Sequence, residues 1–317
     1  MWRKPNASAT TCVASTNFFF CVFVGTYRIL QLIVPRAEVE LASDALWLCG
    51  AQAVEEIQID SQMVCLRTDL GSEPRKHWAE FLATRPEQDL FAVWSVTQIE
   101  IDSGSSDSWR QFAEPTRVAN VLIVPNWKRD SLSEDIRDDD VIVYVEPLGS
   151  FGIGDHPTTR ATLLLALGLM DSGKATSSHS ILDLGCGSGV LGIALAKIHR
   201  CSVTAIDIAP AAIEATLINL SLNGVETHIQ VSLGDVSIAK GHHQLVLANI
   251  LAPVLLDQAD IISKNVELGG SLVLSGFTES RRSDIIDRYV GLGFSFRDEV
   301  EIDGWFAVSL AKTSSPN

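Results

Sequence analysis

The sequence predicts a doubly wound, seven-stranded, Rossmann-like α/β domain preceded by a small ferredoxin-like α+β domain. A short apolar run at residues 181–184 ends in three alternating glycines, and a helical pattern follows at once. Apolar runs then alternate with helical patterns to residue 312, as expected for a parallel sheet with crossover helices. The smaller domain rests on the order strand, helix, strand, strand, helix, strand between residues 28 and 101.

The glycine stretch carries most of the functional information. Residues 181–184, apolar apart from Asp183, are expected to form a buried strand, which leads into Gly185, Gly187 and Gly189 before the helix that starts at Val190. Only a residue without a Cβ lets the backbone turn sharply and lie against a ligand. A strand, a glycine turn and a helix in this order are typical of a nucleotide-type binding crevice.

The charge beside this turn indicates the kind of ligand. Asp183 precedes the first glycine by two residues, and a carboxylate there favours a cationic ligand over a pyrophosphate. The stretch Gly187-Ser-Gly-Val-Leu-Gly192 also fits the dinucleotide pattern GxGxxG, so a nicotinamide-dependent dehydrogenase is one alternative. A tight strand–helix turn that binds nothing is the other.

Polar residues end the next strands, at the edge where such sheets bind ligands. Asp207 ends the second strand and can accept both hydroxyls of an adenosine ribose. Asp235 follows the third strand and can accept the adenine amino group, with an ordinary turn residue as the alternative. Asn249 ends the fourth strand. The strands are expected at residues 202–206, 229–233, 245–248 and 271–274, with a closing hairpin at 294–302 and 305–310.

A second glycine-rich stretch precedes a helix. Gly149, Gly152 and Gly154 lead to His156-Pro-Thr-Thr159, where the proline and hydroxyl groups favour a helix start. The stretch is either a lid over a ligand or a plain helix cap. His156 is the one candidate for a general base, with a structural loop histidine as the alternative.

The domain boundaries follow from composition. Residues 28–101 form the ferredoxin-like domain, with helices expected at 37–48 and 74–83, and residues 102–140 are a polar connector that includes a strand at 121–124. Residues 141–312 form the larger domain. The acidic part of the connector, residues 130–140, is a solvated loop or a docking surface for a basic protein.

Charge and cysteine content limit the classes of function. The net charge of −15 over 317 residues disfavours direct binding to nucleic acid and suits a cationic cosubstrate and a basic protein partner, although solubility is a simpler reason. No apolar run predicts a membrane span. The six cysteines show no paired spacing and the seven histidines no ligand spacing, so we expect reduced thiols and no metal site.

Residues 1–26 differ from the rest of the chain. They contain no acidic residue, are rich in hydroxyl residues and include an apolar patch at 18–24. They are interpreted as a targeting segment or a disordered extension, with a secretory-type signal and a wrongly chosen start codon as alternatives. The expected location is cytoplasmic, or mitochondrial or plastid if this segment is a transit peptide.

Three stretches together resemble the PrmA family of class I S-adenosylmethionine-dependent methyltransferases, which methylate large-subunit ribosomal protein eleven. They are Phe151-Gly-Ile-Gly-Asp-His-Pro-Thr-Thr159, Asp183-Leu-Gly-Cys-Gly-Ser-Gly189 and Ala248-Asn-Ile-Leu-Ala252. The resemblance covers roughly residues 28–311. The chain departs from the family pattern at Ile153 and Asp155, where threonines are usual.

The resemblance implies a set of site residues. Thr159, Gly185, Asp207 and Asn249 would contact S-adenosylmethionine, together with Asp183, Gly187, Gly189 and Asp235, which the strand and turn pattern indicates. The ferredoxin-like domain would present the ribosomal protein.

The implied reaction moves a methyl group from the sulfonium to an amine, so the enzyme mainly aligns the two partners. Asn249 would be the catalytic residue, because its amide can accept a hydrogen bond from the neutral amine. A methyltransferase with another protein or small-molecule substrate and a non-catalytic cosubstrate-binding module remain alternatives. We expect a monomer.

Overall fold

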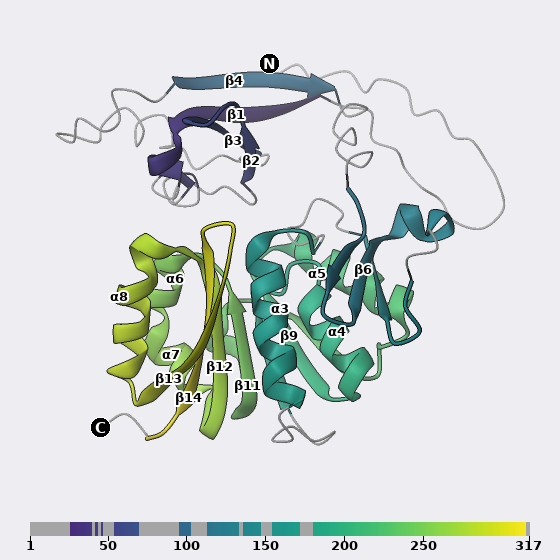
Figure 1. Ribbon diagram of the computed structural model, residues 1–317, viewed down its shortest axis with the longest axis vertical. Coiled ribbons are helices and arrows are strands. Elements are labelled where there is room, and N and C mark those ends of the chain that lie inside the picture. Colours follow the sequence, from purple (N-terminus) through teal and green to yellow (C-terminus); the bar gives the residue numbers. More distant parts are fainter. Residues whose placement is uncertain are drawn as a thin grey trace, which may run out of the picture.

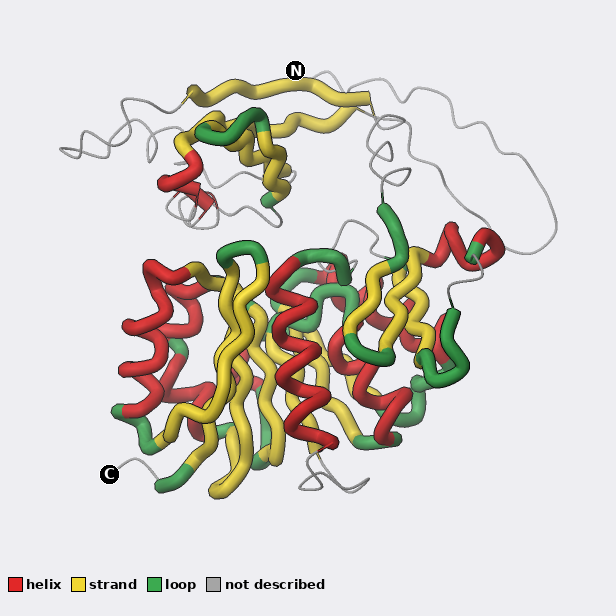
Figure 2. The backbone as a smooth tube through the Cα atoms, viewed as in Figure 1, coloured by secondary structure: helices red, strands yellow, loops and turns green. Residues whose placement is uncertain are grey.

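The computed structural model describes residues 26–39, 42, 43, 46, 54–69, 95–102, 113–132, 136–146, 154–171 and 180–314. These residues form three β-sheets, and helices cover both faces of the largest one (Figures 1 and 2). Residues 1–25 of the expected targeting segment and the helix expected at residues 74–83 lie outside the described residues, and Thr26 begins the first strand. In the part of the chain that is described, no helix is long and apolar enough to cross a membrane.

The largest sheet has seven strands in the order β10-β9-β8-β11-β12-β14-β13. All neighbours in it are parallel except β14, which runs antiparallel to both β12 and β13. This confirms the predicted doubly wound sheet with a closing hairpin. The strands are β8 (Ser180–Leu184), β9 (Ser202–Asp207), β10 (Ile229–Leu233), β11 (His243–Asn249), β12 (Val266–Thr278), β13 (Phe294–Ile302) and β14 (Trp305–Lys312).

The connections place the site. From β8 the chain moves outward to β9 and β10, and it then returns to β11 on the other side of β8. The strand order therefore reverses between β8 and β11, and the loops after these strands diverge to the two faces. Ligands of open α/β sheets bind in the crevice that this divergence leaves at the carboxyl ends of the strands.

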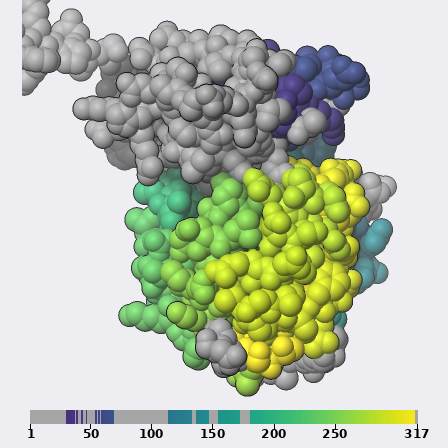
Figure 3. Space-filling model, turned by 90° about the vertical axis from the view of Figure 1, so that its left-hand side faces the viewer, coloured from purple at the N-terminus to yellow at the C-terminus, as the bar shows by residue number. Residues whose placement is uncertain are grey.

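Each face of this sheet has its own apolar core. Along β8, Ile181 packs with α3 and α4, whereas Leu182 packs with the helices of the opposite face, because successive strand residues point to opposite sides. The helices on the first face are α3 (Pro157–Leu169), α4 (Val190–His199) and α5 (Pro210–Asn223). The second face carries α6 (Ala252–Asp257), α7 (Ala259–Lys264) and α8 (Glu279–Val290), and Figure 3 views the molecule from that side.

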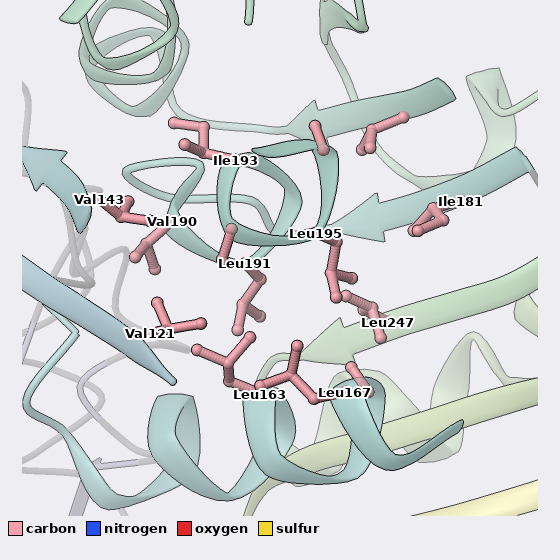
Figure 4. Packing of buried hydrophobic residues seen from close by; sticks show 14 of the residues in the cluster. Val121, Val143, Leu163, Leu167, Ile181, Val190, Leu191, Ile193, Leu195 and Leu247 are labelled. Atoms are coloured by element: carbon pink, nitrogen blue, oxygen red, sulfur yellow. The ribbon is translucent and has the colours of Figure 1, made fainter. Parts of the chain in front are cut away.

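A three-stranded sheet packs against the first face. It consists of β5 (Thr116–Val118), β6 (Val121–Pro125) and β7 (Val141–Val145), with the short helix η4 (Asn126–Ser131) after β6. Val121 and Val143 lie in the same core as Leu163 of α3 and Val190 of α4 (Figure 4). The strand β5 was not predicted, because it is three residues long with one buried side chain and so carries no periodic signal. The strands β5 and β6 belong to the expected connector, and the domain boundaries stay a prediction.

The N-terminal part forms a separate four-stranded antiparallel sheet in the order β2-β3-β1-β4. Its strands are β1 (Thr26–Pro35), β2 (Glu55–Gln58), β3 (Met63–Asp69) and β4 (Ser95–Asp102), with the short helix η1 (Arg36–Glu38) after β1. Ala42 and Leu46 pack on this sheet. The strand order is that of a split βαβ unit, but the second helix lies outside the described residues, so the ferredoxin-like assignment stays a prediction.

Candidate functional site

The glycine turn lies at the carboxyl ends of β8 and β9. The backbone N–H groups of Gly185 and Cys186 both donate to the carbonyl of Ile206, over 2.8 and 3.1 Å, which fixes the turn to the neighbouring strand. Gly185 has φ +69°, and a Cβ added there would lie 2.2 Å from Cγ2 of Ile250. A side chain at Gly185 is therefore strained by the backbone conformation and would require Ile250 to move. Gly187 and Gly189 also have positive φ, at 56° and 78°.

Asp183 lies beneath this turn. It is fully buried on the face covered by α4, and its Oδ2 accepts a hydrogen bond from the N–H of Gly192 over 3.2 Å. Its Oδ1 is buried without a hydrogen-bond partner in the structure. Burial, with a smaller contribution from Asp207, raises the pKa of this carboxyl to about 7. A buried acceptor without a partner is costly, so this atom fits a ligand that brings positive charge or a donor.

Asp207 is held toward the same turn. Its Oδ2 accepts from the N–H of Gly187 and its Oδ1 from the N–H of Ala209, each over 2.9 Å. Each carboxylate oxygen can accept more than one hydrogen bond, so both keep capacity for a ligand hydroxyl. The carboxylate is thereby oriented without being saturated.

Asn249 and Thr159 meet although 90 residues separate them. Nδ2 of Asn249, at the end of β11, donates to Oγ1 of Thr159 in the first turn of α3 over 3.5 Å. Because the contact uses the Nδ2 group of Asn249, its amide oxygen can accept a hydrogen bond from another group.

Residues 26–313 of the chain match the family model described as Ribosomal protein L11 methyltransferase (PrmA). The chain belongs to this family.

Individual relatives agree with this assignment. A ribosomal protein L11 methyltransferase from an Exiguobacterium species is 32% identical over 220 residues, which are 68% of this chain and 68% of that protein. The protein of the same name from Halalkalibacterium halodurans is 30% identical over 203 residues, and the match spans 63% of this chain and 62% of that protein.

One solved structure supports the fold. The crystal structure of ribosomal protein L11 methylase from Lactobacillus delbrueckii subsp. bulgaricus superposes with a TM-score of 0.56 at 24% identity. The superposition covers 64% of this chain and 100% of the Lactobacillus chain.

In this PrmA-family chain His156 serves as the N-cap of α3. Its Nδ1 accepts from the N–H of Thr158 over 3.3 Å, and its ring meets Trp305 edge-on with 5.2 Å between centroids. Burial lowers the pKa of His156 to about 4, so the ring is neutral and its Nδ1 lone pair is engaged in the cap. The geometry therefore supports a structural role for His156 over the role of a general base.

Asp235 also acts as a cap. Its Oδ1 accepts from the N–H of Ser237 over 2.8 Å and so starts the short helix η6 (Val236–Ile238). Its side chain is exposed, and its proposed contact with adenine stays a prediction. The residues of the glycine-rich loop from 147 to 153, with Ile153, lie outside the described residues. Within the described ranges no group of three metal-ligating side chains occurs.

Two side chains of α5 that were not predicted as site residues contact the glycine turn. Oγ1 of Thr216 donates to the carbonyl of Gly187 over 2.9 Å, and Nδ2 of Asn219 donates to the carbonyl of Ser188 over 2.8 Å. Both side chains are fully buried. Polar residues at helical spacing on a face that should be apolar were the available signal.

Proposed function

We propose that this PrmA-family chain transfers methyl groups from S-adenosylmethionine to amino groups of ribosomal protein L11, on lysine side chains, the N-terminus or both. The observation that carries the proposal is the buried, unpartnered Oδ1 of Asp183 beside a glycine turn, with Asn249 at the neighbouring strand end. The family name and the names of both relatives support the substrate.

The residues of the turn would hold the cosubstrate. Gly185, Gly187 and Gly189 leave room for close backbone approach, and Asp207 offers two oriented carboxylate oxygens to a ribose. Asp183 would face the positive charge. S-adenosylmethionine supplies, when bound, a methyl group that is already activated on a sulfonium. A pyrophosphate would add negative charge beside Asp183, which argues against the dehydrogenase alternative.

The acceptor amine must be neutral to attack, because the reaction uses its lone pair. The Nδ2 group of Asn249 is directed to Thr159, so its amide oxygen can accept from the amine N–H and orient the lone pair. No general base is assigned. The net charge of −15 suits a basic ribosomal protein, and the four-stranded sheet lies beyond the end of the large sheet where β13 turns into β14 (Figure 1).

Intact mass spectrometry of purified ribosomal protein L11, incubated with the chain and S-adenosylmethionine, tests the proposal. We expect mass gains in steps of one methyl group, and a loss of turnover of at least about 100-fold for Asn249→Ala. Asn265→Ala is the matched control, since Asn265 donates to the carbonyl of Ile261 at the opposite, amino-terminal edge of the sheet. Peptide mapping of the product identifies the amines.

The outcomes separate the alternatives. Cosubstrate binding without a mass gain on L11 would favour another substrate, and a screen of amines would follow. Binding with no turnover on any amine would favour a non-catalytic module. A chain that binds NADH in competition with S-adenosylmethionine would revive the dehydrogenase. Full turnover by Asn249→Ala would remove this residue from the mechanism.

A further inference from the structure

The inner face of α5 carries three polar side chains that no step of the proposed reaction uses. They are Thr216, Asn219 and Asn223, at helical spacing along one side of the helix. Thr216 and Asn219 are fully buried. A buried polar side chain is retained at a cost unless its hydrogen bonds are made, so the partners of these groups indicate what they do.

On one side, two of these amides form hydrogen bonds with backbone groups on the edge of β7 that is not paired with β6. The backbone groups belong to Tyr144 and to Glu146, which directly follows the strand. Asn219 accepts from the N–H of Glu146 over 2.7 Å and donates to its carbonyl over 3.0 Å. Asn223 does the same with Tyr144, over 2.9 and 2.7 Å. Four helical residues rise about 6 Å and two strand residues about 6.6 Å, so the two spacings match. Lys197 of α4 extends the row by donating to the carbonyl of Ile142.

On the other side, α5 contacts the glycine turn, and here the two asparagines differ. Thr216 and Asn219 donate to the successive carbonyls of Gly187 and Ser188, over 2.9 and 2.8 Å. The second amide hydrogen of Asn223 goes to the carbonyl of Asn219 within the same helix. Of the two asparagines, Asn219 therefore connects the end of β7 to the glycine turn, and Asn223 does not.

Holding a carbonyl also fixes the N–H of the next residue, because the peptide unit is planar. The contact with Gly187 thus sets the direction of the Ser188 N–H, and the contact with Ser188 sets that of Gly189. The Gly189 N–H closes the turn by donating to the carbonyl of Cys186 over 2.7 Å.

We propose that Thr216 and Asn219 are positioning residues, which hold the glycine turn in the shape that receives S-adenosylmethionine. This inference rests on the proposed function for the identity of the ligand. The two residues need not touch the ligand themselves, because they act through the peptide groups of residues 187–189.

The decisive comparison is Asn219→Leu against Asn223→Leu in the full chain. Each variant removes an α5 side chain that forms hydrogen bonds with the backbone at the end of β7. Of the two, only Asn219→Leu also removes a hydrogen bond to the glycine turn. We expect both variants to lower Tm by a similar amount. In calorimetry, Asn219→Leu should bind S-adenosylmethionine about tenfold more weakly, and Asn223→Leu within about twofold of wild type. Equal affinities in the two variants would overturn the proposal for Asn219.

Thr216→Val keeps the volume of the side chain and leaves the contacts of Asn219 with Glu146 in place. It removes only the hydroxyl, which donates to Gly187 and also lies 3.5 Å from Sγ of Cys186. It is the test that remains if Asn219→Leu does not fold, and we expect about three- to tenfold weaker binding. An unchanged affinity in Thr216→Val overturns the role of Thr216.

Amide hydrogen exchange in the absence of ligand separates this inference from the proposed function. The N–H of Gly189 should exchange at least about tenfold faster in Asn219→Leu and at the wild-type rate in Asn223→Leu. If the wild type binds no S-adenosylmethionine, the proposed function fails, while this comparison still decides whether Asn219 holds the turn. Unchanged exchange in Asn219→Leu would show that it does not.

Discussion

The turn at Gly185 has no room for a Cβ atom unless Ile250 moves. Gly185 and Gly224 have nearly equal φ, +69° and +65°, but only Gly185 is crowded, since the nearest atom to its added Cβ would be 2.2 Å away and Gly224 has none within 4 Å. Gly224→Ala should therefore cost about 1–2 kcal/mol of stability, from the left-handed conformation alone. Gly185→Ala should cost at least about 1 kcal/mol more, because Ile250 must move. Urea denaturation measures both; equal losses would contradict the collision.

The buried carboxyl of Asp183 predicts a pH dependence. Its pKa rises from 3.8 to about 7 on folding, so the folded state binds the proton more tightly than the unfolded state. The ligand-free protein should therefore lose stability as pH rises from about 4 to about 7, by roughly 3 to 5 kcal/mol from this group. Asp183→Asn cannot ionise. Its Tm relative to wild type should be several degrees higher at pH 8 than at pH 5, and parallel curves would refute the burial argument.

At the scale of the element, the start of α3 depends on a neutral imidazole. The pKa of His156 falls from 6.5 to about 4 on folding, so its contribution to stability is complete above pH 6.5 and is lost as pH falls toward 4. The loss should reach about 2–3 kcal/mol. His156→Asn keeps a capping acceptor that does not titrate there, so its acid unfolding should begin at lower pH. Coincident acid unfolding of the two proteins would exclude the cap as the cause.

Elements and local motifs were largely predictable from the sequence, and contacts between distant segments were not. The strand from residue 181 and the turn of Gly185 were predictable, because a glycine spacing and an apolar run are local signals. Asn219 was not, since its partner Glu146 lies 73 residues earlier and is a backbone group that any residue type would supply. The contact of Asn249 with Thr159 needed the fold for the same reason.

At the scale of the whole molecule, the apolar cores indicate where the chain can be divided. Among the residues that the structure describes, the cluster on the N-terminal sheet shares no member with the clusters of the large sheet, whereas Val118, Val121 and Ile123 belong to the core under α3 and α4. Composition placed these three residues in a connector. Its polar start is a local signal, but the packing of a short strand is not.

Two fragments test this division. A fragment of residues 113–317 should melt cooperatively and bind S-adenosylmethionine. A fragment of residues 141–317 lacks Val118, Val121 and Ile123 and exposes the core that they cover, so we expect a broad melt and binding of an apolar dye. If both melt alike, β5 and β6 are dispensable and the connector boundary at residue 140 is correct.

The row of side chains along β7 has one more consequence, for solubility. A strand at the edge of a sheet exposes unpaired peptide groups on which another chain can add a strand and begin to aggregate. Along this edge, the side chains of Lys197, Asn223 and Asn219 form hydrogen bonds with the backbone at residues 142, 144 and 146, respectively. A strand that paired along this edge would have to displace one of these side chains at each of the three residues, so the edge is protected from self-assembly without a covering strand.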